Sequence, residues 1–232
     1  MNVVGQAVTW LNDPLNWTNP DGILVRLGEH LRLCSLALLL ALCVGWPLGF
    51  WLGHRGASSG VVVLLSNVTQ AVPVIVLLTV LPLMLGFGST AVIVALAVFS
   101  VPPLVATAYT GLRQVDPEVR DASRGMGFSG WQTLWRVEVP LAIGYLAAGL
   151  RTSAVQVVAT AALASAVNGG GLGQIISAGF GLGIAAGGGQ ILAGGLLIVV
   201  LALAVEAIGS LLQRLVTPRS LRDSGRRGVA NM

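Results

Sequence analysis

Apolar residues are gathered into five long runs that are separated by short polar intervals. The runs cover residues 31–52, 61–85, 90–112, 141–167 and 191–216. Each run is close in length to the roughly 20 residues that an α-helix needs to cross a bilayer. The pattern therefore predicts an all-α polytopic membrane protein with about five transmembrane helices.

The longest polar interval, residues 113–140, begins with the signals of a short helix. Asp116 stands where an N-cap side chain accepts a backbone N–H, and Pro117 takes the first helical position, where no N–H is needed. Glu118 adds negative charge to the first turn, which suits the helix dipole. Gly127 is expected to stop this helix.

A second short helix is predicted later in the same interval. Ser129 and Gln132 have the spacing of a capping box, in which each side chain bonds the other residue's backbone N–H. The helix then carries Trp131 and Trp135 and is expected to end at Pro140, because proline interrupts the helical hydrogen bonds. Two capped helices in one loop suggest a docking surface.

The two ends of the chain are more polar than the apolar runs. Residues 1–30 are predicted to form an extracytoplasmic arm, which is either passive or carries an amphipathic surface helix at about residues 23–33 that packs on the bundle. Residues 217–232 are rich in arginine and are expected to be a disordered, cytoplasmic tail near anionic lipid. The membrane domain lies between them, in residues 31–216.

Composition excludes a soluble globular domain. The chain is 55% hydrophobic and 9% charged, with a mean hydropathy of +0.85, whereas charged residues make up about a quarter of soluble domains. The 13 basic residues are all arginine. Because a Walker A loop needs a lysine that reaches the phosphates, this chain does not form that kind of ATP site, and we expect it to bind no cofactor or metal itself.

The arginines also predict the orientation in the membrane. With the N-terminus outside and the C-terminus in the cytoplasm, the outer segments carry only Arg26 and Arg32. The inner segments then carry the arginines at positions 55, 113, 120, 124, 136, 214, 219, 222, 226 and 227. Because positively charged residues favour the cytoplasmic side, the loop of residues 113–140 is predicted to be cytoplasmic.

Polar side chains recur inside two of the predicted spans. One group clusters before a proline that is expected to kink its helix, and the other recurs at a spacing of four residues, which forms one stripe. The members are Asn67, Gln70 and Pro73 in the second span and Thr152, Gln156 and Thr160 in the fourth. Such groups either line a translocation path or hydrogen-bond between helices.

Arg151 and Glu206 are the two charged residues that fall well inside predicted spans. At a rise of 1.5 Å per residue both lie in the cytoplasmic half of the membrane at similar depth. An isolated charge in hydrocarbon is unfavourable. The two side chains therefore either pair with one another or reach the interface and backbone carbonyls separately.

The glycine-rich segment of residues 168–190 is predicted to be a tightly packed outer loop with a short helix at about residues 172–180. Histidines and cysteines do not form a catalytic or metal-ligating set, because His30 and His54 fall on opposite sides of the membrane. The arginines are dispersed and not interleaved with exposed aromatic residues, so nucleic-acid binding is not expected.

The cytoplasmic loop resembles the EAA motif of the permease subunits of bacterial binding-protein-dependent ABC importers. That motif has Glu-Ala-Ala, a Gly four residues on, an apolar residue ten further on and a Pro three beyond; this chain has the residues DAS at 121–123, then Gly127, Val137 and Pro140. The flanking runs VDP at 115–117, AGLRT at 148–152, TQAVP at 69–73 and NGGGLG at 168–173 look like the osmoprotectant branch. The resemblance spans residues 31–213.

The resemblance implies a type I ABC importer permease in the bacterial cytoplasmic membrane. Its partners are then a cytoplasmic ATP-binding subunit dimer, a second permease copy or paralogue, an extracytoplasmic substrate-binding protein and membrane lipid. ATP and Mg would be bound by the ATPase, and this chain would be a transport subunit without enzymatic activity. The residues expected to contact the ATPase are Val119, Asp121, Ala122, Ser123, Met126, Gly127 and Pro140.

The helical spacing supports part of that contact set, because Val119, Ala122, Ser123 and Met126 fall at i, i+3, i+4 and i+7 on one face. The expected cargo is a compatible solute such as glycine betaine, choline or carnitine. Two alternatives stay open: the same machinery importing an amino acid such as methionine, and a channel or structural membrane subunit without an ATPase.

Overall fold

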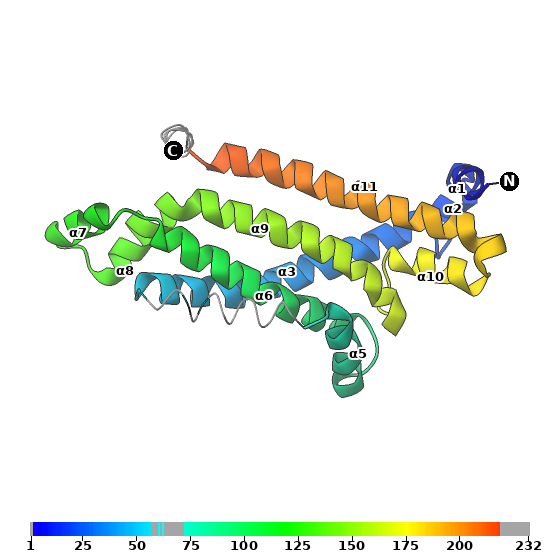
Figure 1. Cartoon of the computed structure of the whole chain (residues 1–232), viewed down its shortest axis with the longest axis horizontal. Helices are drawn as coiled ribbons and strands as arrows, with labels where there is room; N and C mark the ends of the chain where they lie inside the picture. The colour runs from blue at the N-terminus through cyan, green and yellow to red at the C-terminus, as the bar shows by residue number, and fades with distance from the viewer. Residues whose placement is uncertain (1, 57–59, 61, 63–71, 219–232) are drawn as a thin grey trace. The chain divides into compact units, whose positions relative to one another are not determined.

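The computed structural model describes residues 2–56, 60, 62 and 72–218, and the regular structure among these residues is entirely helical (Figure 1). The helices, in chain order, are α1 (Val3–Asn12), α2 (Leu15–Thr18), α3 (Ile23–His54), α5 (Val74–Leu85), α6 (Ser89–Arg113), α7 (Pro117–Gly125), α8 (Gly130–Thr133), α9 (Val139–Ala161), α10 (Gly173–Gly181) and α11 (Ile184–Val216). A π-helical turn, Leu134–Glu138, precedes α9, and a 3₁₀ segment, Ala162–Val167, follows it.

In the described part of the chain, 4 stretches are long and apolar enough to cross a membrane. They are Leu15–His54, Ser89–Arg113, Gly130–Val167 and Ile184–Val216. The expected span at residues 61–85 is represented by α5, which has 12 residues, and most of the preceding segment lies outside the described residues. The prediction of an all-α polytopic membrane protein is confirmed.

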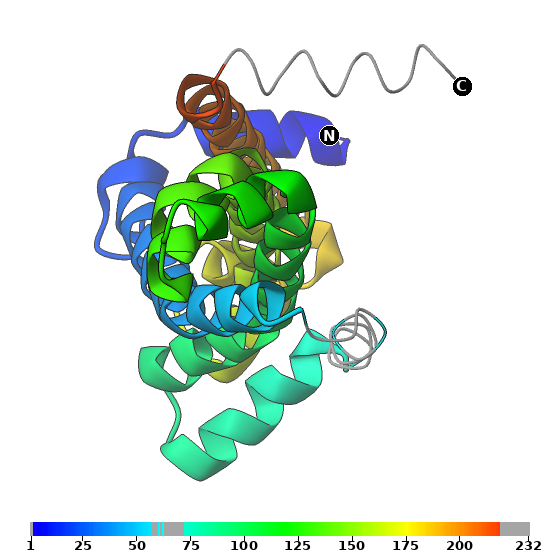
Figure 2. The same cartoon turned by 90° about the vertical axis from the view of Figure 1, so that its left-hand side faces the viewer.

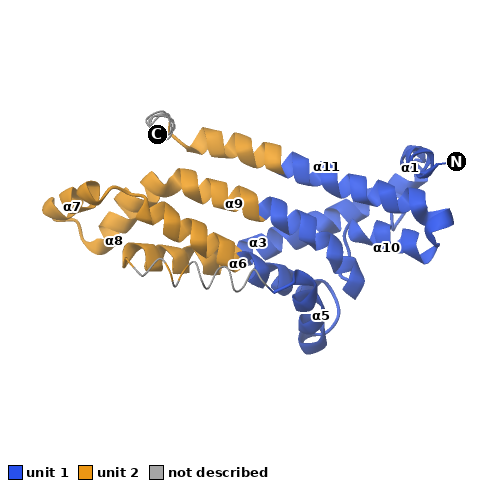
Figure 3. Ribbon diagram, in the orientation of Figure 1, with its two compact units in different colours: residues 1–40, 72–100, 154–205 blue, residues 41–71, 101–153, 206–232 orange. Residues whose placement is uncertain are grey.

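The chain divides into two compact units, which Figure 3 shows in different colours. Unit 1 comprises residues 1–40, 72–100 and 154–205, and unit 2 comprises residues 41–71, 101–153 and 206–232. The long helices α3, α6, α9 and α11 each contribute residues to both units. Because each unit takes segments from distant parts of the sequence, neither is a separate sequence domain.

Unit 1 has an apolar core of small and branched side chains. Ala37, Leu78, Leu96, Val157 and Ala161 are buried in one cluster that joins α3, α5, α6 and α9. A second cluster joins the start of α3 to α10 and α11 through Ile23, Leu172, Ile175 and Ile198. Short side chains let the helices approach closely, as is typical of helix packing in membranes.

Unit 2 is built around the close approach of α3 and α6. A Cβ atom on Gly49 would lie 2.5 Å from the Ala108 Cβ and 2.8 Å from the Val105 carbonyl oxygen. Phe50, Leu112, Leu134 and Leu146 are buried around this contact. Glycine at position 49 is therefore required by the helix separation and not by backbone torsion.

The N-terminal residues are helical and pack in part on the rest of unit 1. Ile23 is 1% exposed, and it is the first residue of α3, so residues 23–33 belong to the long helix and do not form a separate surface helix. In α1, Ala7 is buried, and a Cβ on Gly189 of α11 would lie 2.5 Å from the Gln6 Cβ. Residues 1–30 belong to unit 1, in which Ile23 packs with residues of α10 and α11, although Val4, Val8 and Leu15 stay exposed.

Two expectations about prolines are wrong. Pro73 was expected to kink a helix, but it stands at the N-cap of α5 with an extended ψ of 128°, a position that needs no N–H donor. Pro140 was expected to end the second loop helix, but it lies in the first turn of α9. The π-helical turn before it, in which the Val139 N–H bonds the Leu134 oxygen, shifts the hydrogen-bond register and lets the helix continue.

We predict that Gly49→Ala lowers the stability of the protein by about 1–3 kcal/mol, because the added methyl group must force α3 and α6 apart. Gly28→Ala is the matched control, since Gly28 lies on the same helix and a Cβ there would meet nothing within 4 Å. The measurement is the thermal unfolding midpoint of each purified variant in detergent. Equal midpoints for the two variants would contradict the packing argument.

Candidate functional site

The first loop helix, α7, begins as its sequence signals predict. The Asp116 side chain accepts the Glu118 N–H at 2.8 Å, and Pro117 occupies the first helical position. These contacts satisfy or remove backbone donors that have no partner within the helix. The α7 helix is therefore defined by its own local sequence, at one end of unit 2 (Figure 3).

The end of α7 has the hydrogen bonds of a Schellman motif. The Phe128 N–H bonds the Ser123 oxygen at 3.1 Å, and the Gly127 N–H bonds the Arg124 oxygen at 2.9 Å. Gly127 has a φ of +84°, a left-handed conformation that side chains disfavour. This confirms that Gly127 stops the helix.

The second loop helix, α8, starts with the predicted capping box. The Ser129 N–H donates to the Gln132 side-chain oxygen at 2.8 Å, and the Gln132 N–H donates to Ser129 Oγ at 3.3 Å. The helix then passes through the π-helical turn into α9 without a break. In Figure 2 this α7–α8 region, coloured green, faces the viewer. Because α8, the π-helical turn and α9 are continuous, a displacement of α8 is passed directly to α9.

The structure divides the predicted contact face of α7 into an exposed and a buried part. Val119 and Met126 are 41% and 69% exposed, and Ala122 is also exposed. Ser123 is 2% exposed, because its hydroxyl donates to the Arg120 oxygen at 2.7 Å and lies 3.3 Å from Thr133 Oγ1. Ser123 therefore holds α7 to α8 and is not available to a partner.

The remaining predicted contact residues are at the surface. Asp121 is exposed beside Arg124, with 3.7 Å between Oδ1 and Nη1, and Gly127 and Pro140 are also exposed. Val119 lines a cavity of about 580 Å³ with residues of α6, α9 and α11, including Gly111, Tyr145 and Gln213. The surface available to a partner on α7 thus centres on Ala122 and Met126.

A buried carboxylate that sequence analysis missed lies behind this surface. Glu138 is 0% exposed, with its Oε1 3.1 Å from Arg120 Nε and its Oε2 2.7 Å from His54 Nδ1. Arg120 also donates through Nη2 to the Leu112 oxygen at the end of α6. We call Arg120, Glu138 and His54 the Glu138 cluster. The only sequence signal for it is one acidic residue between the apolar Val137 and Val139.

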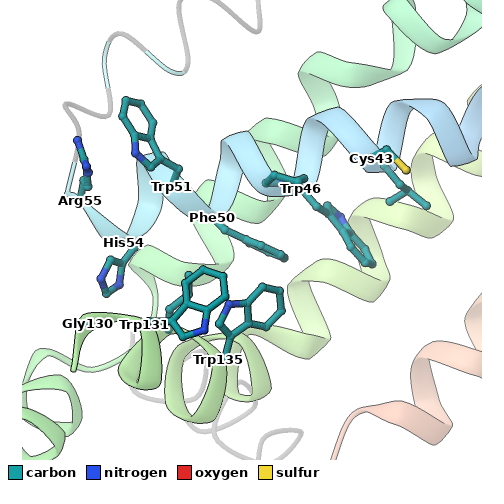
Figure 4. A pocket seen from close by; sticks show the side chains of 12 residues that line it. Cys43, Trp46, Phe50, Trp51, His54, Arg55, Gly130, Trp131 and Trp135 are labelled. Carbon is teal, nitrogen blue, oxygen red and sulfur yellow. The ribbon is translucent and has the colours of Figure 1, made fainter. Parts of the chain in front are cut away.

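Aromatic side chains lie where α8 and the π-helical turn pack against α3 (Figure 4). The Phe50 and Trp135 rings are 5.8 Å apart and nearly perpendicular, and the Trp131 and Trp135 rings are 5.5 Å apart. Trp46 packs on Phe50 at 6.1 Å. These residues line an open groove of about 620 Å³. Edge-to-face contacts of this kind add to the burial that holds α8 and the π-helical turn against α3.

The candidate translocation path is only partly described. Asn67 and Gln70 lie outside the described residues, and Pro73 is exposed at the start of α5. Thr152 is exposed on α9, and Gln156 and Thr160 are half-buried there. The Thr160 hydroxyl donates to the Gln156 oxygen at 2.8 Å, so part of the polar stripe serves the helix's own backbone.

Arg151 and Glu206 lie opposite one another in unit 2. Arg151 Nη1 is 3.5 Å from Glu206 Oε1. The aliphatic part of the Arg151 side chain packs against Gly209, where a Cβ atom would lie 2.7 Å from the Arg151 Cγ. The side chains are 29% and 44% exposed. The geometry is that of an ion pair between α9 and α11.

The glycine-rich turn after α9 is fixed to α3. The Gly171 N–H donates to Glu29 Oε2 at 2.9 Å, and the Leu172 N–H donates to His30 Nδ1 at 3.3 Å. His30 is fully buried, with Nε2 3.0 Å from the Val158 oxygen. The predicted short helix in this segment is present as α10. His30 has a structural role that its isolated position in the sequence does not reveal.

Membrane-length apolar helices and a capped, surface-exposed loop helix define a polytopic membrane protein with a candidate docking loop. The chain belongs to the family of binding-protein-dependent transport system inner membrane components, whose family model matches residues 45–219. It is accordingly a multi-pass protein of the cytoplasmic membrane.

Relatives and solved structures agree on this family. The chain is 34% identical over 219 residues to the glycine betaine/carnitine/choline transport system permease protein OpuCB of Bacillus subtilis, covering 94% of this chain and 97% of that protein. It is 31% identical to the choline transport system permease protein OpuBD of the same organism, covering 99% and 98%. A solved inward-facing structure of the MetNI methionine ABC transporter matches with a TM-score of 0.75, 25% identity and coverage of 89% and 100%.

We predict that Gly127→Ala loosens the end of α7, because a left-handed conformation costs a residue with a side chain about 1–2 kcal/mol. Amide hydrogen exchange at Phe128 should become roughly 5- to 30-fold faster. Gly125→Ala is the control, since a Cβ there meets nothing within 4 Å and Gly125 is helical. Unchanged exchange in Gly127→Ala would show that the helix end does not depend on glycine.

If Arg151 and Glu206 form an ion pair, the effects of substituting them on solute uptake should not be additive. Arg151→Gln and Glu206→Gln should each lower solute uptake, because each leaves one charge without its partner in the membrane. The double variant should recover most of the activity of the native protein. The measurement is uptake by the reconstituted transporter. A double variant that is as impaired as the sum of the single variants would exclude the pair as a functional unit.

Proposed function

We propose that this chain is the transmembrane subunit of an ATP-driven importer and that α7 is its contact with the ATPase. The carrying observation is the exposed helix α7, capped at Asp116 and stopped at Gly127, in a loop with the motif spacing of residues 121–140. Ala122 and Met126 offer a small apolar surface with charged residues on either side. Such a surface suits a shallow groove on a partner protein.

A rigid loop helix supports mechanical coupling. Local hydrogen bonds fix α7 at both ends, and Ser123 joins it to α8. Since α8, the π-helical turn and α9 are continuous, movement of α7 reaches a membrane-spanning helix without passing through a flexible segment. In the proposed mechanism, closure of an ATPase dimer moves α7 and converts the permease from inward-open to outward-open.

The proposal assigns ATP hydrolysis to a separate subunit. The chain has no lysine for a Walker A loop, so ATP and Mg are bound by the partner. One chain supplies one α7 and an ATPase dimer offers two grooves, so a second permease copy or a paralogue completes the assembly. An extracytoplasmic binding protein delivers the solute. This chain itself binds no cofactor.

The proposed cargo is a compatible solute such as glycine betaine, choline or carnitine. Permeases from Bacillus subtilis whose names include these compounds are similar to this chain over nearly its full length. The Phe50 ring packs on the rings of both Trp46 and Trp135, so these aromatic faces are used in contacts within this chain. We therefore assign to the external binding protein the aromatic faces that select a quaternary ammonium group. Purified binding protein titrated with glycine betaine, choline and methionine distinguishes this cargo from an amino acid.

We predict that Ala122→Glu abolishes association with the ATPase and ATP-dependent uptake, because it places a carboxylate in the centre of the proposed apolar contact. Asn12→Glu is the control; it adds the same charge at an exposed position on the N-terminal arm. The measurements are ATPase recovery in a mild-detergent pull-down and uptake of labelled glycine betaine. If Ala122→Glu retains both, the coupling assignment is wrong.

A channel or structural subunit makes a different prediction. Such a protein would be purified without a stoichiometric ATPase, and solute flux through it would not depend on ATP. The same pull-down and uptake experiment on the native chain therefore decides between the two classes.

A further inference from the structure

We propose that Glu138 is a positioning residue that links α7 to the C-terminal end of α3, so that α3 moves with the coupling helix. The inference rests on the proposed function, because it concerns where motion received by α7 goes next. Glu138 itself touches neither solute nor nucleotide in this account.

The need for such a link follows from the chain topology. Helix α7 is joined covalently to α6 on one side and to α8 and α9 on the other. Helix α3 ends at His54, far earlier in the sequence, so among the described residues it is coupled to α7 by non-covalent contacts. The His54 and Glu138 contact spans a sequence separation of 84 residues.

The Glu138 cluster provides this contact from both sides. On one side, Arg120 of α7 lies 3.1 Å from the Glu138 carboxylate and also donates to the Leu112 oxygen. On the other side, His54 at the end of α3 lies 2.7 Å from the same carboxylate. The Glu138 side chain thus connects the π-helical turn with the coupling helix and α3, and Arg120 extends the connection to the end of α6.

Burial makes the link stiff. The Glu138 side chain is 1% exposed and that of Arg120 is 12% exposed. A carboxylate without water must keep its charged partner, since an unpaired buried charge is strongly unfavourable. Arg120 and Glu138 therefore have to move together, unlike a solvated surface pair that can separate at little cost.

The imidazole of His54 is also restricted on the side of its second ring nitrogen, Nε2. A Cβ on Gly130 would lie 3.2 Å from His54 Nε2, so the first residue of α8 closes against the imidazole. Figure 4 shows His54 beside Gly130, with Phe50, Trp131 and Trp135 next to them. The His54 ring is held between Gly130 at the start of α8 and the Glu138 carboxylate. This arrangement favours movement of α3 together with α8 and the π-helical turn.

The test uses the complete transporter in liposomes, with its ATPase and solute-loaded binding protein. Solute uptake and ATP hydrolysis are measured together, and their ratio is compared. Glu138→Gln keeps the shape of the side chain but removes its charge, so uptake per ATP should fall at least about fivefold, the lower end of typical coupling free energies. ATPase recovery in the pull-down should not change.

His54 supplies a second, independent pair of variants. His54→Ala should lower uptake per ATP in the same way, whereas His54→Asn should restore it, because its amide nitrogen takes the place of Nδ1. This pair decides the question if Glu138→Gln does not assemble. Arg136→Gln is the matched control, since Arg136 is an exposed residue of the same π-helical turn; its ratio should equal that of the native protein.

Three outcomes overturn the proposal. One is a native ratio in both Glu138→Gln and His54→Ala. Another is a proportional loss of uptake and hydrolysis with an unchanged ratio, which is what a merely structural role gives. The third is failure of His54→Asn to improve on His54→Ala. A native chain that recovers no ATPase would instead refute the proposed function, so the two failures are distinguishable.

Discussion

The Arg120–Glu138 ion pair is the interaction on which the organisation of the cytoplasmic loop depends. It holds the short helix α7 to the π-helical turn, and Arg120 also donates to the Leu112 oxygen at the end of α6. The carboxylate is fully buried, so its partners cannot be lost without a large free-energy penalty. Next to His54, the edge-to-face contact of Phe50 and Trp135 adds apolar packing between α3 and the π-helical turn that carries Glu138.

The rest of unit 2 supports this arrangement through close helix packing. Gly49 permits α3 to lie against α6, and Arg151 pairs with Glu206 between α9 and α11. Short side chains and paired charges are the means by which helices associate where lipid removes most of the hydrophobic driving force. Within unit 1, the side chains of Glu29 and His30 accept hydrogen bonds from the glycine-rich turn.

Features that depend on a few neighbouring residues were predictable from the sequence. The caps at Asp116 and Ser129 and the stop at Gly127 all have local causes, and the structure contains them. The apolar runs predicted the membrane class for the same reason. The similar depth of Arg151 and Glu206 could also be calculated from helix rise alone.

Features that depend on distant residues were not predictable. Nothing local to His54 indicates that it meets a carboxylate 84 residues away. The helix continues past Pro140 because a π-helical turn shifts the register, and the burial of Ser123 depends on where α8 packs. Periodicity placed Ser123 on the same face as Met126, but tertiary packing decides which part of a face remains exposed.

Site-directed cross-linking tests the central claim most directly, namely that α7 is the contact between this chain and an ATPase. Met126→Cys, in a chain whose Cys34 and Cys43 are replaced by alanine, is treated in native membranes with a short reagent whose maleimide bonds the Cys thiol and whose succinimidyl ester acylates a lysine amine of the neighbouring protein. The account predicts a covalent adduct between the permease and the ATPase subunit, which Asn12→Cys does not form. An intact complex that gives no adduct at position 126 would contradict it.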